Sequence, residues 1–201
     1  MIYKKYGKRI IDFVLSLLGL IILAPIILLL IICIKMDSRG PVLFKQRRIG
    51  IKKEEFYILK FRTMKMDTPK DTPTHLLENP EMYITRVGKF LRKTSLDEFP
   101  QIINILRGEM SIIGPRPALW NQYDLINERD KYRANDVLPG LTGWAQINGR
   151  DELPIKVKSR LDGEYVEKVS FIFDVVIFCK TIFSVLKREG VKEGSRQSKT
   201  L

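Results

Sequence analysis

Two adjacent carboxylates, Asp97 and Glu98, are the residues of this sequence best suited to chemistry. They stand in the segment TSLDEFPQ, after a basic stretch that includes Arg92 and before the apolar run IINIL. A carboxylate can act as a nucleophile, an acid or base, or a metal ligand. At the start of a helix it would also lie beside free backbone N–H groups, which attract phosphate. The segment therefore predicts a site where carboxylates and phosphate-binding groups meet.

A helix cap is the competing interpretation of the same residues. Ser95-x-x-Glu98 matches a capping box, and acidic residues in a first turn are favoured by the helix dipole. With Ser95 as the N-cap, Pro100 would fall where its missing N–H is felt, which makes Asp97 an alternative N-cap. On spacing alone, capping outweighs catalysis.

Several basic residues could contact phosphate. Arg116 lies between two prolines in GPRP (114–117), and this restricted backbone would preorganise its guanidinium for bidentate phosphate contact. Lys60 and Arg62 in KFRTM, and Arg150 in INGR, add further cations. Taken singly, Pro-Arg-Pro is more simply a helix break with an exposed arginine, and the other cations are unspecific.

Composition narrows the class of partner. The chain has 201 residues, a net charge of +12 and a pI near 9.7, which indicates an anionic partner. Zinc-finger spacing, RNA-binding aromatic signatures and bZIP patterns are all absent from the sequence, so nucleic acid is not expected. Cys33 and Cys179 form no metal-ligand cluster or disulfide framework, and His75 is the only histidine. Carboxylates must therefore carry any chemistry.

The chain begins with a membrane element. Residues 13–34 carry no charged side chain, and a spanning helix needs about 20 apolar residues. No small-residue cleavage site follows, so the segment is expected to be retained. Basic residues flank it on both sides: Lys4, Lys5, Lys8 and Arg9 before it, and Lys35, Arg39, Lys45, Arg47 and Arg48 after it.

These two basic flanks favour a helix that returns to the side it came from. Positive flanks prefer the cytoplasm, which a straight span cannot satisfy at both ends. Pro25 would kink the helix near its middle, so Ala24 and Pro25 are the predicted hinge. An ordinary spanning helix with a tolerated proline is the alternative.

The remaining pattern predicts an α+β fold, mainly helical, around a compact cytosolic domain. We expect a small hairpin from strands at 41–48 and 56–61, a surface loop at 65–82, helices at 85–92 and 119–131, and a long ordered loop at 139–154. Residues 171–188 should form an amphipathic helix, either interfacial or part of the core. The expected organisation is a membrane helix at 1–36, a catalytic domain at 37–190 and a flexible tail at 191–201.

Taken together, ordered blocks across nearly the whole chain resemble the small monotopic phosphoglycosyl transferases, the bacterial sugar transferases that start glycoconjugate assembly on undecaprenyl phosphate. The blocks are the basic and apolar N-terminus with Ala24-Pro25, FKQRRIG (44–50), KFRTM (60–64), RKTSLDEFPQIINILRGEMSIIGPRPAL (92–119) and PGLTGWAQINGR (139–150). In that family a Ser-Pro or similar pair breaks a re-entrant helix. Here Ala24 takes the serine position, and the bend is still expected.

The resemblance implies a reaction and a site, and it reverses the odds on the two carboxylates. Asp97 would attack the sugar-bearing phosphorus of a UDP-sugar and release UMP, and undecaprenyl phosphate would then take the sugar phosphate. Asp97 would also bind the cofactor Mg²⁺, while Glu98 would orient Asp97, help hold Mg²⁺ or handle protons. Expected phosphate ligands are Arg92, Arg116 and Arg150, then Lys60 and Arg62. Trp144 is expected to pack rather than bind the nucleotide.

The resemblance also implies a setting. The enzyme would be monotopic in the bacterial inner membrane, with its catalytic domain on the cytoplasmic face, and later glycosyltransferases are possible partners. The segments ALWNQYDLI (118–126) and GRDELPI (149–155) resemble members associated with capsule and exopolysaccharide assembly. They weakly favour an N-acetylated or deoxy-amino hexose, with galactose and glucose still open.

Two rival hypotheses remain. In one, undecaprenyl phosphate attacks the nucleotide sugar directly and Asp97 only binds Mg²⁺. In the other, the chain is a noncatalytic membrane scaffold or regulator that binds anionic lipid. Release of UMP without lipid separates the first rival from the covalent route, and a complete lack of turnover would favour the second.

Overall fold

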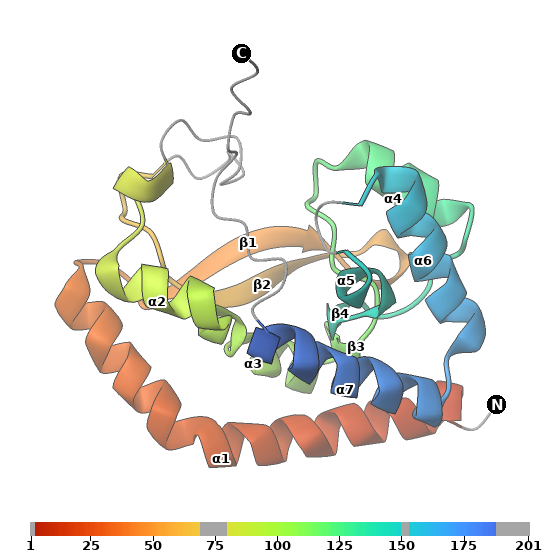
Figure 1. The fold of residues 1–201 in the computed structure, drawn as a ribbon, viewed down its shortest axis with the longest axis horizontal. Coiled ribbons are helices and arrows are strands. Elements are labelled where there is room, and N and C mark those ends of the chain that lie inside the picture. The colour runs from red at the N-terminus through yellow and green to blue at the C-terminus, as the bar shows by residue number, and fades with distance from the viewer. Residues whose placement is uncertain (1–2, 69–79, 150–152, 188–201) are drawn as a thin grey trace.

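A computed structural model describes residues 3–68, 80–149 and 153–187, and it is mainly helical with two small sheets (Figure 1). The helices are α1 (Lys8–Asp37), α2 (Arg86–Thr94), α3 (Gln101–Arg107), α4 (Tyr123–Asp130), α5 (Trp144–Ile147), α6 (Ile155–Lys168) and α7 (Phe171–Lys187). Short helical turns are η1 (Tyr3–Gly7), η2 (Ile51–Lys53), η4 (Pro80–Met82) and η5 (Leu96–Glu98). The strands are β1 (Leu43–Ile49), β2 (Glu55–Phe61), β3 (Ser111–Ile113) and β4 (Gly140–Thr142).

The predicted hairpin is confirmed. β1 and β2 pair antiparallel from Leu43 opposite Phe61 to Ile49 opposite Glu55. Alternation along β2 sends Phe56 and Ile58 into a cluster with Ile105 and Met110, which joins the hairpin to α3 and the strand β3 region. The hairpin therefore packs against α3, the helix that follows the turn with the two predicted carboxylates.

By length and composition, α1 could cross a membrane. No other helix among the described residues meets both criteria. Both ends of α1 are attached to the rest of the chain. Near its start, Arg9 donates to the carbonyls of Ile105 and Leu106 at the end of α3 (2.5 and 3.1 Å). At its other end, Asp37 accepts from the backbone N–H of Val87 in α2 (2.9 Å).

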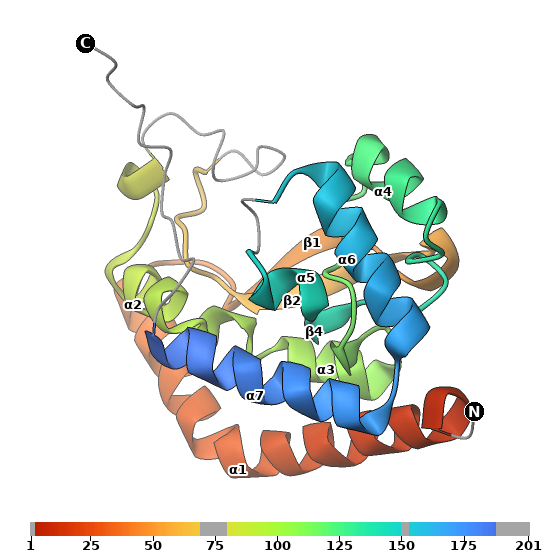
Figure 2. The same cartoon turned by 45° about the vertical axis from the view of Figure 1, so that its right-hand side comes forward.

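Pro25 lies inside α1 without ending it, and the ribbon bends part-way along its length in both Figure 1 and Figure 2. Because the two ends rest on α3 and α2, the helix runs along the body of the protein instead of standing away from it. A membrane return at the Ala24–Pro25 hinge stays a prediction.

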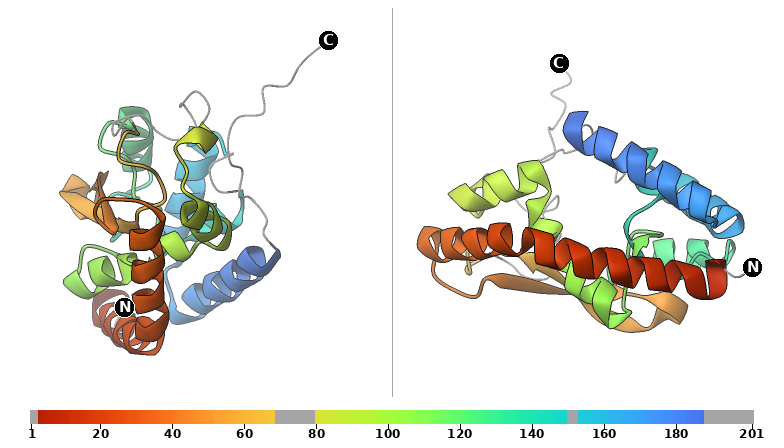
Figure 3. Two further views of the ribbon diagram at one scale, coloured as in Figure 1. Left: turned by 90° about the vertical axis from the view of Figure 1, so that its left-hand side faces the viewer. Right: turned by 90° about the horizontal axis from the view of Figure 1, so that it is seen from below.

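α1 and α7 share one face of the molecule, which is seen from below in the right-hand view of Figure 3. Both helices carry large exposed apolar side chains: Phe13, Leu18, Ile21, Ile22, Leu28 and Leu29 on α1, and Phe171, Ile172, Phe178, Ile182 and Phe183 on α7. The predicted helix at 171–188 is thus confirmed as α7. Its outer face has the apolar surface expected of an element that meets lipid.

The other predicted elements differ in detail. The helix at 85–92 is confirmed as α2, whereas the helix at 119–131 begins only at Tyr123, because Leu119 and Gln122 form a turn closed by a backbone hydrogen bond of 3.0 Å. The loop at 65–82 is described only in part, since residues 69–79, with His75, lie outside the described residues, as does the predicted tail at 191–201.

The prediction of an irregular loop at 139–154 was wrong, because β4 and α5 lie within it. β4 pairs in parallel with β3, with Ser111 opposite Gly140. Glycine permits this pairing: a Cβ on Gly143 would lie 2.0 Å from the carbonyl oxygen of Gly114. The glycines that indicated a loop in the sequence instead allow two backbones to approach closely.

Candidate active site

The two carboxylates lie in a tight turn between α2 and α3. Ser95 adopts a left-handed conformation (φ 57°, ψ 17°) that ends α2, and Leu96–Glu98 then forms a single 3-10 turn. α3 begins after Pro100 without a side-chain cap. The capping-box prediction was therefore wrong: Ser95 terminates the preceding helix and makes no cap bond to the next one.

Glu98 is held by two cations from distant parts of the chain. Its Oε1 accepts from Lys60 Nζ of β2 at 2.7 Å and from Arg116 Nη2, beyond β3, at 3.3 Å. Burial raises the pKa of Glu98, but Lys60 and Arg116 lower it by more, so the net pKa lies below its usual range. Glu98 is therefore ionised at neutral pH and paired with both cations.

Asp97 has different surroundings. Its carboxylate accepts no hydrogen bond from the described residues, although Lys60, Arg92 and Arg116 are close enough to act on it electrostatically. Burial raises the pKa of Asp97, and the charge of Glu98 raises it further against the three cations, for a net increase. Asp97 thus combines carboxylate oxygens that no described residue hydrogen-bonds with a pKa above that of a free aspartate.

Arg92 reaches the turn from the last turn of α2. Its Nε donates to Thr63 Oγ1 at 2.9 Å, just after β2. α2 can pack this closely because a Cβ on Gly88 would lie 2.0 Å from the carbonyl oxygen of Thr63. The close crossing sets the cation beside the two carboxylates.

The structure brings together five of the predicted site residues: Asp97, Glu98, Lys60, Arg92 and Arg116. Together they form the carboxylate–cation cluster. Arg150 lies outside the described residues.

Arg62 does not belong to the cluster, which corrects its prediction as a phosphate ligand. Only 5% of it is exposed, and its guanidinium donates to the carbonyls of Ser38 and Arg39 just beyond α1 (2.7 and 2.5 Å). These carbonyls follow the last turn of a helix, where backbone acceptors lack helical partners. Arg62 therefore secures the end of the apolar helix.

The cluster fits Mg²⁺ only as a site shared with a substrate. Within the described ranges, no three His, Cys, Asp or Glu side chains gather to make a cation site from protein alone. Mg²⁺ commonly binds through one or two carboxylates together with substrate phosphates and water. Asp97, whose oxygens no described residue hydrogen-bonds, and its neighbour Glu98 match that pattern.

Comparison with known proteins decides the family. A sequence model of the family described as bacterial sugar transferase matches residues 3–188. The chain belongs to the bacterial sugar transferase family. It is 39% identical over 186 residues to the protein named uncharacterized sugar transferase EpsL of Bacillus subtilis (strain 168), covering 92% of this chain and 90% of that protein.

Two longer relatives have names that state an activity. The chain is 42% identical over 184 residues to UDP-glucose:undecaprenyl-phosphate glucose-1-phosphate transferase of Escherichia coli (strain K12), covering 88% of this chain and 39% of that protein. It is 35% identical over 191 residues to UDP-N-acetylgalactosamine-undecaprenyl-phosphate N-acetylgalactosaminephosphotransferase of Aeromonas hydrophila, covering 92% and 45%. The chain therefore spans less than half the length of these two sugar transferases.

Trp144 packs within this bacterial sugar transferase, as expected. Its ring lies 5.1 Å from that of Phe173, and its Nε1 donates to Glu164 at 3.1 Å. These contacts join α5 to α6 and α7.

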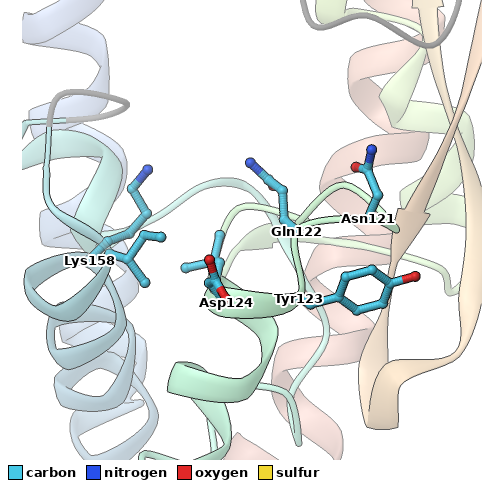
Figure 4. A pocket seen from close by; sticks show the side chains of 7 residues that line it. Asn121, Gln122, Tyr123, Asp124 and Lys158 are labelled. Atoms are coloured by element: carbon cyan, nitrogen blue, oxygen red, sulfur yellow. The ribbon is translucent and has the colours of Figure 1, made fainter.

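A separate pocket lies between the starts of α4 and α6, with a volume of about 230 Å³ (Figure 4). Figure 4 shows Gln122 and Lys158 extending toward the same open side. The two segments that resemble capsule-associated members, 118–126 and 149–155, both contribute to its wall, whereas none of the carboxylate–cation cluster does. Its lining residues are Asn121, Gln122, Tyr123, Asp124, Leu125, Ile155 and Lys158.

Replacing Glu98 should remove the contribution of its ion pairs to the free energy of unfolding, and the size of this loss should depend on pH. Because the folded-state pKa of Glu98 is lowered, its contribution is fully present above the ordinary value of 4.5 and is lost as the pH falls through the folded value. Glu98→Gln should lower the free energy of unfolding at pH 7 by about 2 kcal/mol. The deficit should shrink below pH 4.5, as measured by thermal unfolding in detergent.

Glu55→Gln is the matched control, because Glu55 pairs with Arg47 at 3.3 Å on the surface. That change should stay within about 0.5 kcal/mol of the native protein. Equal losses in the two variants, or a Glu98→Gln deficit that does not change with pH, would contradict a stabilising role for the Glu98 ion pairs.

Proposed function

We propose that this bacterial sugar transferase moves a sugar 1-phosphate from a UDP-sugar to undecaprenyl phosphate and releases UMP through a covalent aspartyl intermediate. The observation that carries the proposal is the division between two adjacent carboxylates. Glu98 is neutralised by Lys60 and Arg116, whereas Asp97 accepts no hydrogen bond from the described residues and has a raised pKa. The names of the relatives from Escherichia coli and Aeromonas hydrophila support the substrate classes.

In the first step an Asp97 oxygen attacks the phosphorus that bears the sugar. A P–O bond forms to Asp97, the P–O bond to the UMP phosphate breaks, and UMP leaves with that electron pair. Arg92 and Arg116 counter the charge on the transferring group, and Lys60 supports them through Glu98. A nucleophile must keep its lone pairs available, which supports Asp97 over Glu98 for this role.

In the second step a phosphate oxygen of undecaprenyl phosphate attacks the same phosphorus. The bond to Asp97 breaks, the carboxylate is regenerated, and the lipid leaves with a diphosphate-linked sugar. Asp97 would help hold Mg²⁺, which would supply charge neutralisation for the substrate phosphates. The cations of the cluster are suited to hold each phosphate in turn.

The apolar face shared by α1 and α7 supports work at a membrane surface. The two helices lie on one side of the protein in the right-hand view of Figure 3, and both carry exposed apolar side chains, such as Ile22 on α1 (71%) and Ile172 on α7 (75%). We propose that this face enters the inner leaflet of the bacterial inner membrane with the site on the cytoplasmic side. A site at that depth would be within reach of both a soluble nucleotide sugar and a lipid phosphate.

The attachment of both ends of α1 supports a re-entrant helix. Arg9 bonds to α3 and Asp37 to α2, so a single body holds the helix at its start and at its end. A straight span would carry one end across the bilayer, about 30 Å from the other. Later enzymes that extend the lipid-linked sugar are the expected partners.

A panel of UDP-sugars tests the proposed reaction. With undecaprenyl phosphate and Mg²⁺, the native protein should release UMP from at least one donor, and UDP-glucose and UDP-N-acetylgalactosamine are the first to try. Asp97→Asn should reduce the rate by at least about 1000-fold, because the substituted amide is a poor nucleophile. Chelation of Mg²⁺ should also abolish release.

The outcomes separate the alternatives. No UMP from any donor would favour the lipid-binding scaffold, and full activity in Asp97→Asn would remove Asp97 as the nucleophile. Asp124→Asn, in the separate pocket, tests whether replacing any surface carboxylate reduces UMP release. Its effect on the rate should be much smaller than that of Asp97→Asn.

Cysteine labelling tests the re-entrant helix. The experiment uses a background in which Cys33 and Cys179 are replaced by serine. Lys4→Cys places a single thiol before α1, and Lys45→Cys, made separately, places a single thiol after it. A membrane-impermeant maleimide should label both in inside-out vesicles and neither in right-side-out vesicles. Labelling of the two positions from opposite sides would establish a spanning helix instead.

A further inference from the structure

The backbone around Arg116 is held at every carbonyl from 115 to 118. Two prolines in this stretch supply no N–H donors, so the segment is fixed through its acceptors. The bonds are Pro115 O from Gly140 N (2.8 Å), Arg116 O from Arg129 Nη1 (2.9 Å), Pro117 O from Arg48 Nη1 (2.9 Å) and Ala118 O from Ile49 N (3.0 Å).

The donor to Arg116 belongs to a buried ion pair. Arg129, in α4, bonds Asp162 Oδ2, in α6, through Nε at 2.8 Å and Nη2 at 2.6 Å. The two side chains are 4% and 1% exposed. This geometry fixes the guanidinium on one edge and directs its remaining Nη1 at the carbonyl of Arg116.

Stability alone is a weak reason for such a pair. Desolvation of two charges offsets most of their attraction, and well-packed apolar residues can replace a buried ion pair with no loss of stability. Apolar residues could not, however, donate to the carbonyl of Arg116. The distinctive consequence of this pair is therefore a fixed backbone at the arginine of the carboxylate–cation cluster.

We propose that Arg129 and Asp162 are positioning residues for the transfer reaction, acting through Arg116. The prolines restrict φ on both sides of Arg116, and Arg129 fixes the orientation of its carbonyl. Only side-chain torsions remain to be ordered when Arg116 turns from Glu98 to a diphosphate. Preorganisation of this kind reduces the entropy lost on binding and keeps the charge aligned with the reacting phosphorus.

A double-mutant cycle tests the coupling, and its kinetic form rests on the proposed function. The apolar replacement Arg129→Met with Asp162→Leu should lower kcat/KM for UMP release by about 100-fold in the native background. In an Arg116→Ala background the same replacement should cause less than about a threefold further loss, because residues that act as one unit are not additive. Independent losses that multiply would overturn the proposal.

Unfolding measurements separate positioning from folding. Asp162→Asn alone should lower Tm, because it leaves the Arg129 charge buried without its partner. The apolar double replacement should recover Tm without recovering activity, whereas recovery of both would contradict positioning. If the double replacement does not fold, Arg129→Lys, which keeps the charge opposite Asp162, is carried through the same cycle with the same criteria.

Lys131→Met is the matched control, since Lys131 forms an exposed pair with Glu128 just after α4 and should leave kcat/KM unchanged. Absence of UMP release by the native protein would count against the proposed function and is seen before any variant is made. In that case the affinity of the same variants for UDP is measured by calorimetry, and the double-mutant cycle is built from those affinities. Non-additive weakening supports positioning of a phosphate-binding arginine, and additive weakening overturns it.

Discussion

The compensation of one partly buried carboxylate, Glu98, is the interaction on which the rest of the site depends. A carboxylate removed from water requires close opposite charges, and Lys60 and Arg116 provide them from β2 and from the segment after β3. Three parts of the chain that are distant in sequence must therefore meet at one turn. Because Glu98 pairs with Lys60 and Arg116, the neighbouring Asp97 has cations close by while its own oxygens accept no hydrogen bond from the described residues.

The apolar helix is connected to this same arrangement at both ends. Asp12, 3% exposed in the first part of α1, accepts from Ser111 Oγ at 2.7 Å and from the Ile112 N–H at 3.2 Å. β3 leads directly to Arg116, so one end of α1 supports that arginine. The other end, through Asp37 and Val87, supports α2 and hence Arg92. The element proposed to enter the membrane thus also fixes both arginines of the cluster.

The sequence indicated most residues of the carboxylate–cation cluster but not the contacts that hold them in place. Adjacent acidic residues and a Pro-Arg-Pro segment are local signals, and the hairpin was predicted from two short extended segments close together in the sequence. Arg62 was misassigned because the sequence does not distinguish a buried arginine that bonds carbonyls at the end of a helix from an exposed arginine that binds phosphate. Gly140 and Gly143 were interpreted as signs of a loop because their close approach to Gly114 is a long-range contact that the local sequence does not indicate.

Arg129 and Asp162 were missed for a related reason. They lie 33 residues apart on separate helices, and neither position has a local spacing that distinguishes a buried pair from surface charge. The carbonyl of Arg116, to which Arg129 donates, is a backbone atom that no side-chain pattern can indicate. Only the packing of α4 against α6 identifies them.

The most direct measurement of the central claim is the intact mass of the protein after incubation with Mg²⁺ and a UDP-sugar that it turns over, without undecaprenyl phosphate. The account predicts that the native chain gains the mass of one sugar phosphate. It also predicts that Asp97→Asn gains none, and that added undecaprenyl phosphate removes the gain. An unmodified native chain under conditions that support full turnover, or an equal adduct on Asp97→Asn, would contradict Asp97 as the nucleophile.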